Sequence, residues 1–134
     1  MSKNSGFQFK QFFIEHIHCA MKVGTDSIML GSWVSTCQAK RILDIGCGSG
    51  ILSLMLAQKT TNDCQIHGID VDAGAVKQAI INSKNCPWHD RLIFSQVSMQ
   101  NFHSQACFDV IVSNPPYFSA YTRTCESTMT EQNK

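Results

Sequence analysis

Residues 41–58 read RILDIGCGSGILSLMLAQ, and this stretch decides the fold. The apolar run 41–45 ends in a glycine-rich turn, which predicts a short buried strand. Residues 51–58 are apolar nearly all round, which predicts a helix packed against a sheet. A strand that leads through a tight loop into a buried helix is the first half of a βαβ unit.

The same alternation of strands and helices continues along the chain. Short apolar runs predict three further strands at 65–70, 91–97 and 108–113, and apolar residues at helical spacing predict a helix at 73–84. Strands separated by helices form parallel sheets with right-handed crossovers. The sequence therefore predicts an α/β fold with a doubly wound, Rossmann-like sheet.

Two segments precede this unit. Residues 7–21 are rich in aromatic side chains and predict an extended arm or hairpin. Thr25 and Asp26 can cap free backbone N–H groups, so they predict the start of a helix at 27–34.

The four predicted strands are fewer than the roughly five to seven of a doubly wound sheet. The last of them, at 108–113, is apolar on both faces, and nothing after it in the sequence predicts an element that covers its edge. We therefore expect the chain to be the front half of a longer protein. Residues 119–134 are polar without an apolar period and predict a mobile tail.

Composition limits the class of protein. Of the 134 residues, 43% are hydrophobic, which is enough for one domain with a core. Eleven Lys and Arg balance ten Asp and Glu, so the total charge neither favours nor excludes nucleic acid. No apolar run reaches the roughly 18 to 20 residues of a membrane span, and the polar N-terminus is unlike a secretory signal.

The cysteines and histidines indicate neither disulfides nor a metal. Seven scattered cysteines without a CxxC pair favour a reducing, cytoplasmic setting. His16, His18 and Cys19 are ligand-type residues in a row, but a zinc site needs about four converging ligands. We expect no metal.

The loop after the first strand carries Gly46, Gly48 and Gly50, and Asp44 stands just before it. Dinucleotides and S-adenosylmethionine both bind such loops, but a pyrophosphate needs N–H donors and is repelled by a carboxylate. S-adenosylmethionine carries a sulfonium and an ammonium, which a carboxylate favours, so we predict this cofactor. Asp70 ends the second strand and is predicted to accept hydrogen bonds from ribose, while Asp72 caps the following helix.

A second motif, Asn114-Pro115-Pro116-Tyr117, follows the fourth strand. The prolines leave carbonyls as the main-chain hydrogen-bonding groups. Asn114 and Pro115 can thus present two acceptors to one amine, and Tyr117 offers a face for stacking, as a base-modifying enzyme requires. The alternative is a common Asn-Pro turn that ends a strand. Because this motif occurs together with the glycine loop, at the end of an adjacent strand, we favour the functional interpretation.

These motifs resemble a known group. ILDIGCGSGIL, GIDVD and FDVIVSNPPY look like motifs of class I amino-methyltransferases, and FQFKQFFIEHIHCAMKVGTDSIMLGSW is similar to the start of bacterial tRNA(Val) (adenine-N6)-methyltransferases. The resemblance implies transfer of a methyl group from S-adenosylmethionine to the N6 amine of a tRNA adenine next to the anticodon. For this reaction we expect direct, in-line transfer, without a metal or a covalent enzyme intermediate.

The resemblance also implies different roles for successive segments of the chain. Residues 1–40 would form an arm and helix over the cofactor, with 9–12 and 22–26, including Lys22 and Thr25, closing on its methionine end. Residues 41–118 would form a partial cofactor-binding core. Ser98 stands where the family usually has a carboxylate that binds the adenine amine, so we expect weaker binding there.

Three alternatives remain open. A protein glutamine methyltransferase also uses such an Asn-Pro-Pro-Tyr motif, but it normally carries a helical module upstream, for which only about 40 residues are available here. A truncated, non-catalytic cofactor-binding fragment is the second, and a nucleotide reductase, opposed by Asp44 and by the acceptor motif, is the third. The oligomeric state is not indicated by the sequence.

Overall fold

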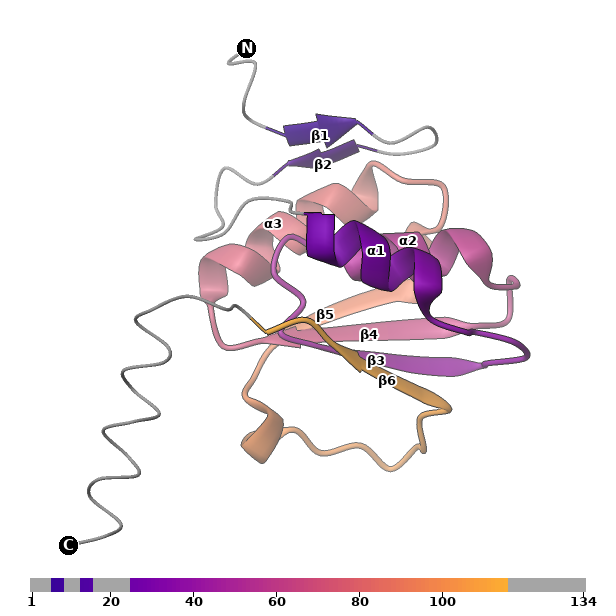
Figure 1. Ribbon diagram of the computed structural model, residues 1–134. Helices are drawn as coiled ribbons and strands as arrows, with labels where there is room; N and C mark the ends of the chain where they lie inside the picture. The colour runs from indigo at the N-terminus through magenta and orange to yellow at the C-terminus, as the bar shows by residue number, and fades with distance from the viewer. Residues whose placement is uncertain (1–5, 9–12, 16–24, 116–134) are drawn as a thin grey trace, which may run out of the picture.

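A parallel sheet of four strands is the frame of the molecule (Figure 1). The computed structural model describes residues 6–8, 13–15 and 25–115. Within these, the sheet has the order β5-β4-β3-β6, made of the strands β3 (Arg41–Ile45), β4 (Gln65–Asp70), β5 (Leu92–Gln96) and β6 (Val110–Ser113). All three pairings are parallel, which confirms the predicted α/β class.

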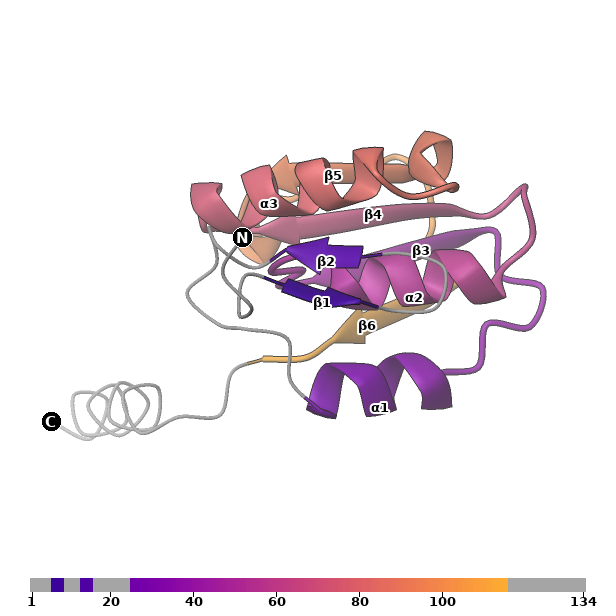
Figure 2. The same ribbon diagram turned by 90° about the horizontal axis from the view of Figure 1, so that it is seen from above.

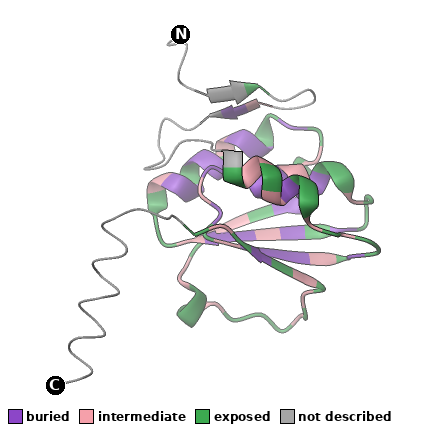
Figure 3. Cartoon of the chain, viewed as in Figure 1, coloured by how far each residue is buried: buried purple, intermediate pink, exposed green. Residues whose placement is uncertain are grey.

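Three helices lie on one face of this sheet. Viewed from above, α3 (Ala73–Lys84) lies over β4 and β5, α2 (Ile51–Lys59) over β3, and α1 (Thr25–Trp33) beside β6 (Figure 2). The core forms between the sheet and these helices, where the segments coloured as buried face one another (Figure 3). The centre of this core is formed by side chains that are 0% exposed: Leu54 and Leu56 of α2 and Ile42 and Ile66 of the central strands. The helix α2 is apolar nearly all round, so it can be buried on more than one side.

The opposite face of the sheet is crossed by the segment that joins β5 to β6 (Figure 1). This segment contains the short 3₁₀ helix η2 (Met99–Asn101) and the two phenylalanines Phe102 and Phe108. Phe102 packs edge-on against His67 of β4 with ring centroids 5.2 Å apart, and Phe108 lies under the guanidinium of Arg41. The chain thereby returns past β4 and β3 and adds β6 on the far side of β3, so the strand order reverses between β3 and β6.

Where an extended arm or hairpin was predicted at 7–21, the described residues form a short antiparallel pair of strands. Strand β1 (Gly6–Gln8) pairs antiparallel with β2 (Phe13–Glu15), and β2 contacts α3. Ile14 is 0% exposed and belongs to the core cluster, which explains how so short a hairpin is held in place.

The predicted bounds of β3, β4 and α3 agree with the structure, and α2 extends one residue beyond its prediction. The strand predicted at 91–97 is shorter, since Arg91 ends a 3₁₀ helix, η1 (His89–Arg91). Its guanidinium donates to the carbonyls of Ala57 and Cys64 at 2.7 and 3.1 Å and so holds the end of α2.

Two other predictions need correction. The strand predicted at 108–113 begins only at Val110, because the Asp109 carboxylate accepts hydrogen bonds from the N–H groups of Lys40 and Arg41 at 2.7 and 3.1 Å. The helix predicted at 27–34 begins at Thr25, so Thr25 and Asp26 lie inside its first turn instead of capping it. An acid in the first turn stabilises a helix through the helix dipole.

None of the helices in the described part of the chain has the length and apolar character needed to cross a membrane. Within the described ranges, no three His, Cys, Asp or Glu side chains are grouped so that they could hold a metal ion. His16, His18 and Cys19 lie outside those ranges, as does the segment 119–134, for which a mobile tail was predicted.

Candidate functional site

Every strand of the sheet is followed at its carboxyl end by a residue that the sequence singled out. The glycine loop follows β3, Asp70 ends β4, Ser98 follows β5 and Asn114 follows β6. Parallel strands have their carboxyl ends at one edge, so the fold gathers these residues. The edge also holds the switch point between β3 and β6, where open α/β sheets bind ligands.

The glycines of the loop differ in what surrounds them. All three have positive φ: 72° at Gly46, 54° at Gly48 and 86° at Gly50. A Cβ added at Gly46 or Gly48 would meet nothing within 4 Å, whereas one at Gly50 would lie 3.2 Å from the Cβ of Ala79. The first two glycines therefore border open space, and the third allows the loop to pack on α3.

The N–H groups at the start of the loop donate to protein acceptors. Gly46 and Cys47 both donate to the carbonyl of Ile69, at 2.8 and 3.0 Å. Gly48 donates to Oδ2 of Asp70 at 2.9 Å. A phosphate site needs such donors free, so the loop is poorly suited to a pyrophosphate, as its charge had indicated.

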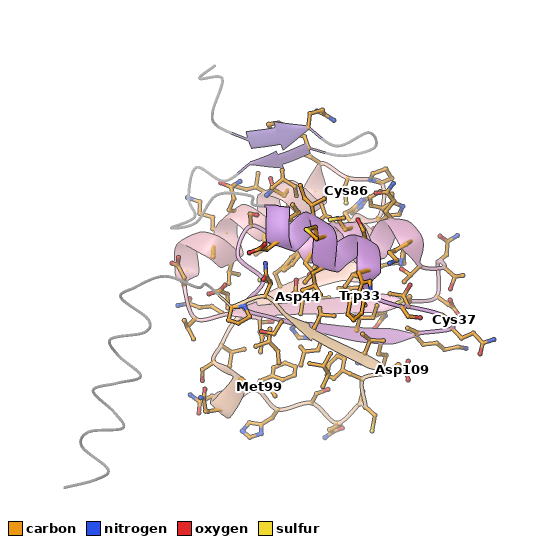
Figure 4. All side chains as sticks on the ribbon, viewed as in Figure 1. Trp33, Cys37, Asp44, Cys86, Met99 and Asp109 are labelled. Atoms are coloured by element: carbon orange, nitrogen blue, oxygen red, sulfur yellow. The ribbon has the colours of Figure 1, made fainter. Side chains whose placement is uncertain are left out.

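Asp44 lies near the carboxyl end of β3, just before the loop (Figure 4). It is 1% exposed. Its Oδ2 accepts a hydrogen bond from Ser53 Oγ of α2 at 2.7 Å. Burial raises the pKa of Asp44 to about 6; the hydrogen bond from Ser53 opposes this rise, and the charge of Asp70 contributes to it. Because Asp44 is almost fully buried, it has little surface for direct contact with a ligand. Its main effect on a ligand is electrostatic.

Asp70 is tied to the loop and to the next helix. Besides the bond from Gly48, its Oδ1 accepts from the N–H of Asp72 at 3.0 Å. A carboxylate has about four lone-pair positions, so the half-buried Asp70 can still accept from a ligand. Asp72 accepts from the N–H of Gly74 at 3.0 Å, which confirms its predicted role as the cap of α3.

No ion pair in the described part of the chain involves Asp44 or Asp70. Two carboxylates thus stand at the ends of neighbouring strands without a cation among the described residues. This arrangement favours a positively charged ligand in the open space before Gly46 and Gly48.

Ser98 follows β5 and caps η2, since its side chain accepts a hydrogen bond from the N–H of Asn101 at 3.3 Å. The hydroxyl is half-buried and carries no charge. Any contact of Ser98 with a ligand would share this hydroxyl with the cap.

Asn114 lies next to the glycine loop. Ile45 of β3 is paired with Ser113 of β6. The glycine loop, which follows β3, and the acceptor motif, which follows β6, therefore begin side by side. The side chain of Asn114 is half-buried, and its Nδ2 donates to Ser27 Oγ of α1 at 2.8 Å. Pro115 is exposed.

Several predicted site residues lie outside the described residues. These are Lys22, Pro116, Tyr117 and the segment 9–12. Thr25 is described as part of α1, but its side chain is not.

Sequence reasoning missed three polar residues that support the site. Ser53 binds Asp44, Ser27 binds Asn114, and Asn82 of α3 is 1% exposed with its Nδ2 donating to the carbonyl of Ser49 at 2.8 Å. Only Asn82 had a signal, because it shares a helical face with the apolar Ala75 and Ala79.

Comparison with known proteins agrees with this geometry. A family model described as "Methyltransferase small domain" matches residues 14–132. The chain is 49% identical over 120 residues to the tRNA1(Val) (adenine(37)-N6)-methyltransferase of Aeromonas hydrophila, which covers 90% of this chain and 50% of that protein. It is 55% identical over 128 residues to the protein of the same name from Pseudoalteromonas atlantica, covering 88% of this chain and 48% of that one. The chain thus spans about half the length of these curated relatives.

Solved structures share the fold. A Klebsiella pneumoniae protein assigned as an O-methyltransferase matches with a TM-score of 0.56 and 25% identity, over 69% of this chain and 44% of that one. A Methanococcus maripaludis protein assigned as an S-adenosyl-L-methionine-dependent methyltransferase matches with a TM-score of 0.51 and 29% identity, over 55% of this chain and 33% of that one.

Proposed function

The chain belongs to the methyltransferase small domain family, and on that premise we propose that it uses S-adenosylmethionine to methylate the N6 amine of adenine 37 in tRNA1(Val). The specific substrate is taken from the names of the relatives that match about 90% of this chain. The observation that carries the proposal is the pairing of Ile45 with Ser113, by which the glycine loop and Asn114 begin at neighbouring positions of adjacent strands. A tRNA substrate implies a cytoplasmic protein.

The residues at the sheet edge suit this cofactor. Gly46 and Gly48 border open space, and Asp44 and Asp70 supply negative charge that no cation among the described residues neutralises. The cofactor's ammonium and sulfonium would offset that charge, and a remaining lone pair of Asp70 can accept from ribose. In this proposal Gly46, Gly48 and Gly50 shape the loop, Asp44 acts through its field, and Ser98 offers a hydroxyl toward adenine.

On the acceptor side, Asn114 is proposed to accept a hydrogen bond from the target amine. Its Nδ2 is committed to Ser27, and among the described residues nothing donates to its Oδ1. That oxygen and the carbonyl of Pro115 can orient the amine, while Pro116 and Tyr117 complete the motif by stacking and rigidity.

The chemistry asked of the chain is mainly positioning. S-adenosylmethionine supplies an electrophilic methyl group when it is bound. The side chains described above hold the amine so that its lone pair faces that methyl group, and no metal or covalent intermediate is required of them.

Asn114→Ala tests the proposal. Removing one such acceptor should lower kcat for methylation of a tRNA1(Val) transcript by about 10²- to 10³-fold, while the Kd for S-adenosylmethionine, measured by calorimetry, stays within about twofold. The exposed Asn62→Ala is the matched control, and the relative from Aeromonas hydrophila is the positive control for the assay.

Other results would point elsewhere. Full activity of Asn114→Ala would overturn the assignment of the acceptor site. Binding of S-adenosylmethionine by the unmutated chain without methyl transfer would identify a non-catalytic cofactor-binding fragment. Methylation of a glutamine-containing peptide instead of tRNA would identify a protein glutamine methyltransferase.

A further inference from the structure

The amide of Asn114 meets α1 through one hydrogen bond. Asn114 Nδ2 donates to Ser27 Oγ at 2.8 Å, across 87 positions of sequence. An asparagine amide has a donor end and an acceptor end that look alike in shape but are opposite in chemistry. Because the donor end faces α1, the acceptor end Oδ1 is turned away from α1.

The hydroxyl of Ser27 stands on a helix that is itself firmly docked. Gly31 of α1 lies so close to α2 that an added Cβ would be 2.7 Å from Sδ of Met55. At the end of α2, Lys59 Nζ donates to the carbonyls of Gly31, Ser32 and Val34, at 3.1, 3.3 and 2.5 Å. The helix that begins at the glycine loop therefore also fixes the helix that holds Asn114.

We propose that Ser27 is a positioning residue: its hydroxyl accepts from Asn114 Nδ2, anchors that side chain against α1 and so keeps Oδ1 directed toward the target amine. This inference rests on the proposed function, in which Asn114 Oδ1 accepts from that amine. Without this anchor the Asn114 side chain can leave its rotamer and present its NH₂ group to the substrate. Two donors then face each other, and the amine is no longer oriented.

The kinetic test compares two substitutions of Ser27 in the whole chain. Ser27→Ala should lower kcat for tRNA methylation about tenfold, the worth of one ordinary hydrogen bond. The Kd for S-adenosylmethionine should not change, because the loop makes no described contact with Ser27. Ser27→Thr keeps a hydroxyl and should restore kcat to within about threefold.

The matched control is Ser32→Ala, on the same helix. Ser32 is exposed, and its hydroxyl donates to the carbonyl of Ile28 within the helix. Its removal should leave kcat unchanged. An equal loss in Ser32→Ala and Ser27→Ala would mean that the effect comes from a weakened helix, and it would overturn the inference.

An NMR measurement separates this inference from the proposed function, since it needs no turnover. The side-chain NH₂ resonances of Asn114 are assigned by their loss in Asn114→Ala. They should shift in Ser27→Ala and stay near their original positions in Ser27→Thr. Unshifted resonances in Ser27→Ala overturn the inference even if the chain methylates tRNA. If the resonances shift in Ser27→Ala but the unmutated chain transfers no methyl group, the hydrogen bond between Ser27 and Asn114 is supported and the proposed function is refuted instead.

Discussion

The two halves of the candidate site are built in different ways. On the donor side, defined by the loop 46–50 with Asp44 and Asp70, the contacts run to the two central strands and to the buried face of α3. On the acceptor side, defined by Asn114 and α1, the sheet contributes β6, whose described partner is β3 alone and whose Ile111 is 57% exposed. The donor side is thus part of the core, whereas the acceptor side depends on how a helix docks. Substitutions on the donor side should change stability and cofactor affinity, and those on the acceptor side should change the transfer step.

Gly50→Ala should have the largest effect and would break the donor side. Gly50 has a φ of 86°, and an added Cβ would lie 3.2 Å from Ala79 and 3.3 Å from Phe94. The left-handed conformation and the crowding together should lower the free energy of unfolding by about 3 to 4 kcal/mol. Urea denaturation followed by circular dichroism measures this loss.

Gly46→Ala is the matched control for crowding. Gly46 has a φ of 72°, but a Cβ there meets nothing within 4 Å. Its substitution should cost only about 1 to 2 kcal/mol, the conformational part. Equal losses at both positions would mean that Gly50 does not pack the loop on α3.

Asp44→Asn should stabilise the unliganded protein. Burial raises the pKa of Asp44 from 3.8 to about 6, so between these values the folded protein holds a proton that the unfolded chain has released. The contribution of Asp44 to stability is therefore full below about pH 4 and falls as the pH rises to about 6. Asparagine removes that loss, and the gain at pH 8 should reach about 3 kcal/mol.

The same substitution should weaken binding of S-adenosylmethionine, because it removes the negative charge beneath the loop. Urea denaturation near pH 8 and pH 4, with calorimetry at pH 8, measures both effects. Ser53→Ala is the opposite control: it removes the hydrogen bond that favours the charged carboxylate and should destabilise at pH 8. A gain from Asp44→Asn that is as large at pH 4 as at pH 8 would exclude the buried charge as its cause.

Asn82→Ala should remove a buried hydrogen bond that holds the glycine loop on α3. Asn82 is 1% exposed, and its amide holds the carbonyl of Ser49 at 2.8 Å. Leaving a buried carbonyl without its partner should cost about 2 kcal/mol and lower the affinity for S-adenosylmethionine. The exposed Asn85→Ala, at the end of the same helix, should change stability by no more than about 0.5 kcal/mol. Unchanged cofactor affinity in Asn82→Ala would show that the loop keeps its shape without this contact.

The sequence was most informative where structure follows from local pattern. The bounds of β3, β4 and α3 and the cap at Asp72 were predicted because burial, periodicity and capping act within a few residues. The start of β6 was predicted too early, since the Asp109 carboxylate is engaged with Arg41, 68 positions away.

The same limit applies to the site. The positions of Asp70 and Asn114 at one edge follow from the parallel direction of the strands, which the alternation of strands and helices predicts. Their partners do not follow from it: Asn82 lies 33 positions from Ser49, and Ser27 lies 87 positions from Asn114. A polar residue on a helix shows which face it occupies only when its neighbours are apolar, and it does not show which surface that face will meet.

Lys59→Met tests the acceptor side and should have the smallest effect on stability. Its ammonium joins three carbonyls at the end of α1, and methionine keeps most of the apolar stem while removing those bonds. We expect a loss of about 1 kcal/mol, as for a helix cap. The rate of methyl transfer should fall while the Kd for S-adenosylmethionine stays constant, because α1 carries Ser27 but no described part of the glycine loop. The exposed Lys77→Met, on α3, is the matched control and should change neither. If Lys59→Met weakened cofactor binding as much as transfer, the two sides would be one mechanical unit and the distinction between them would be wrong.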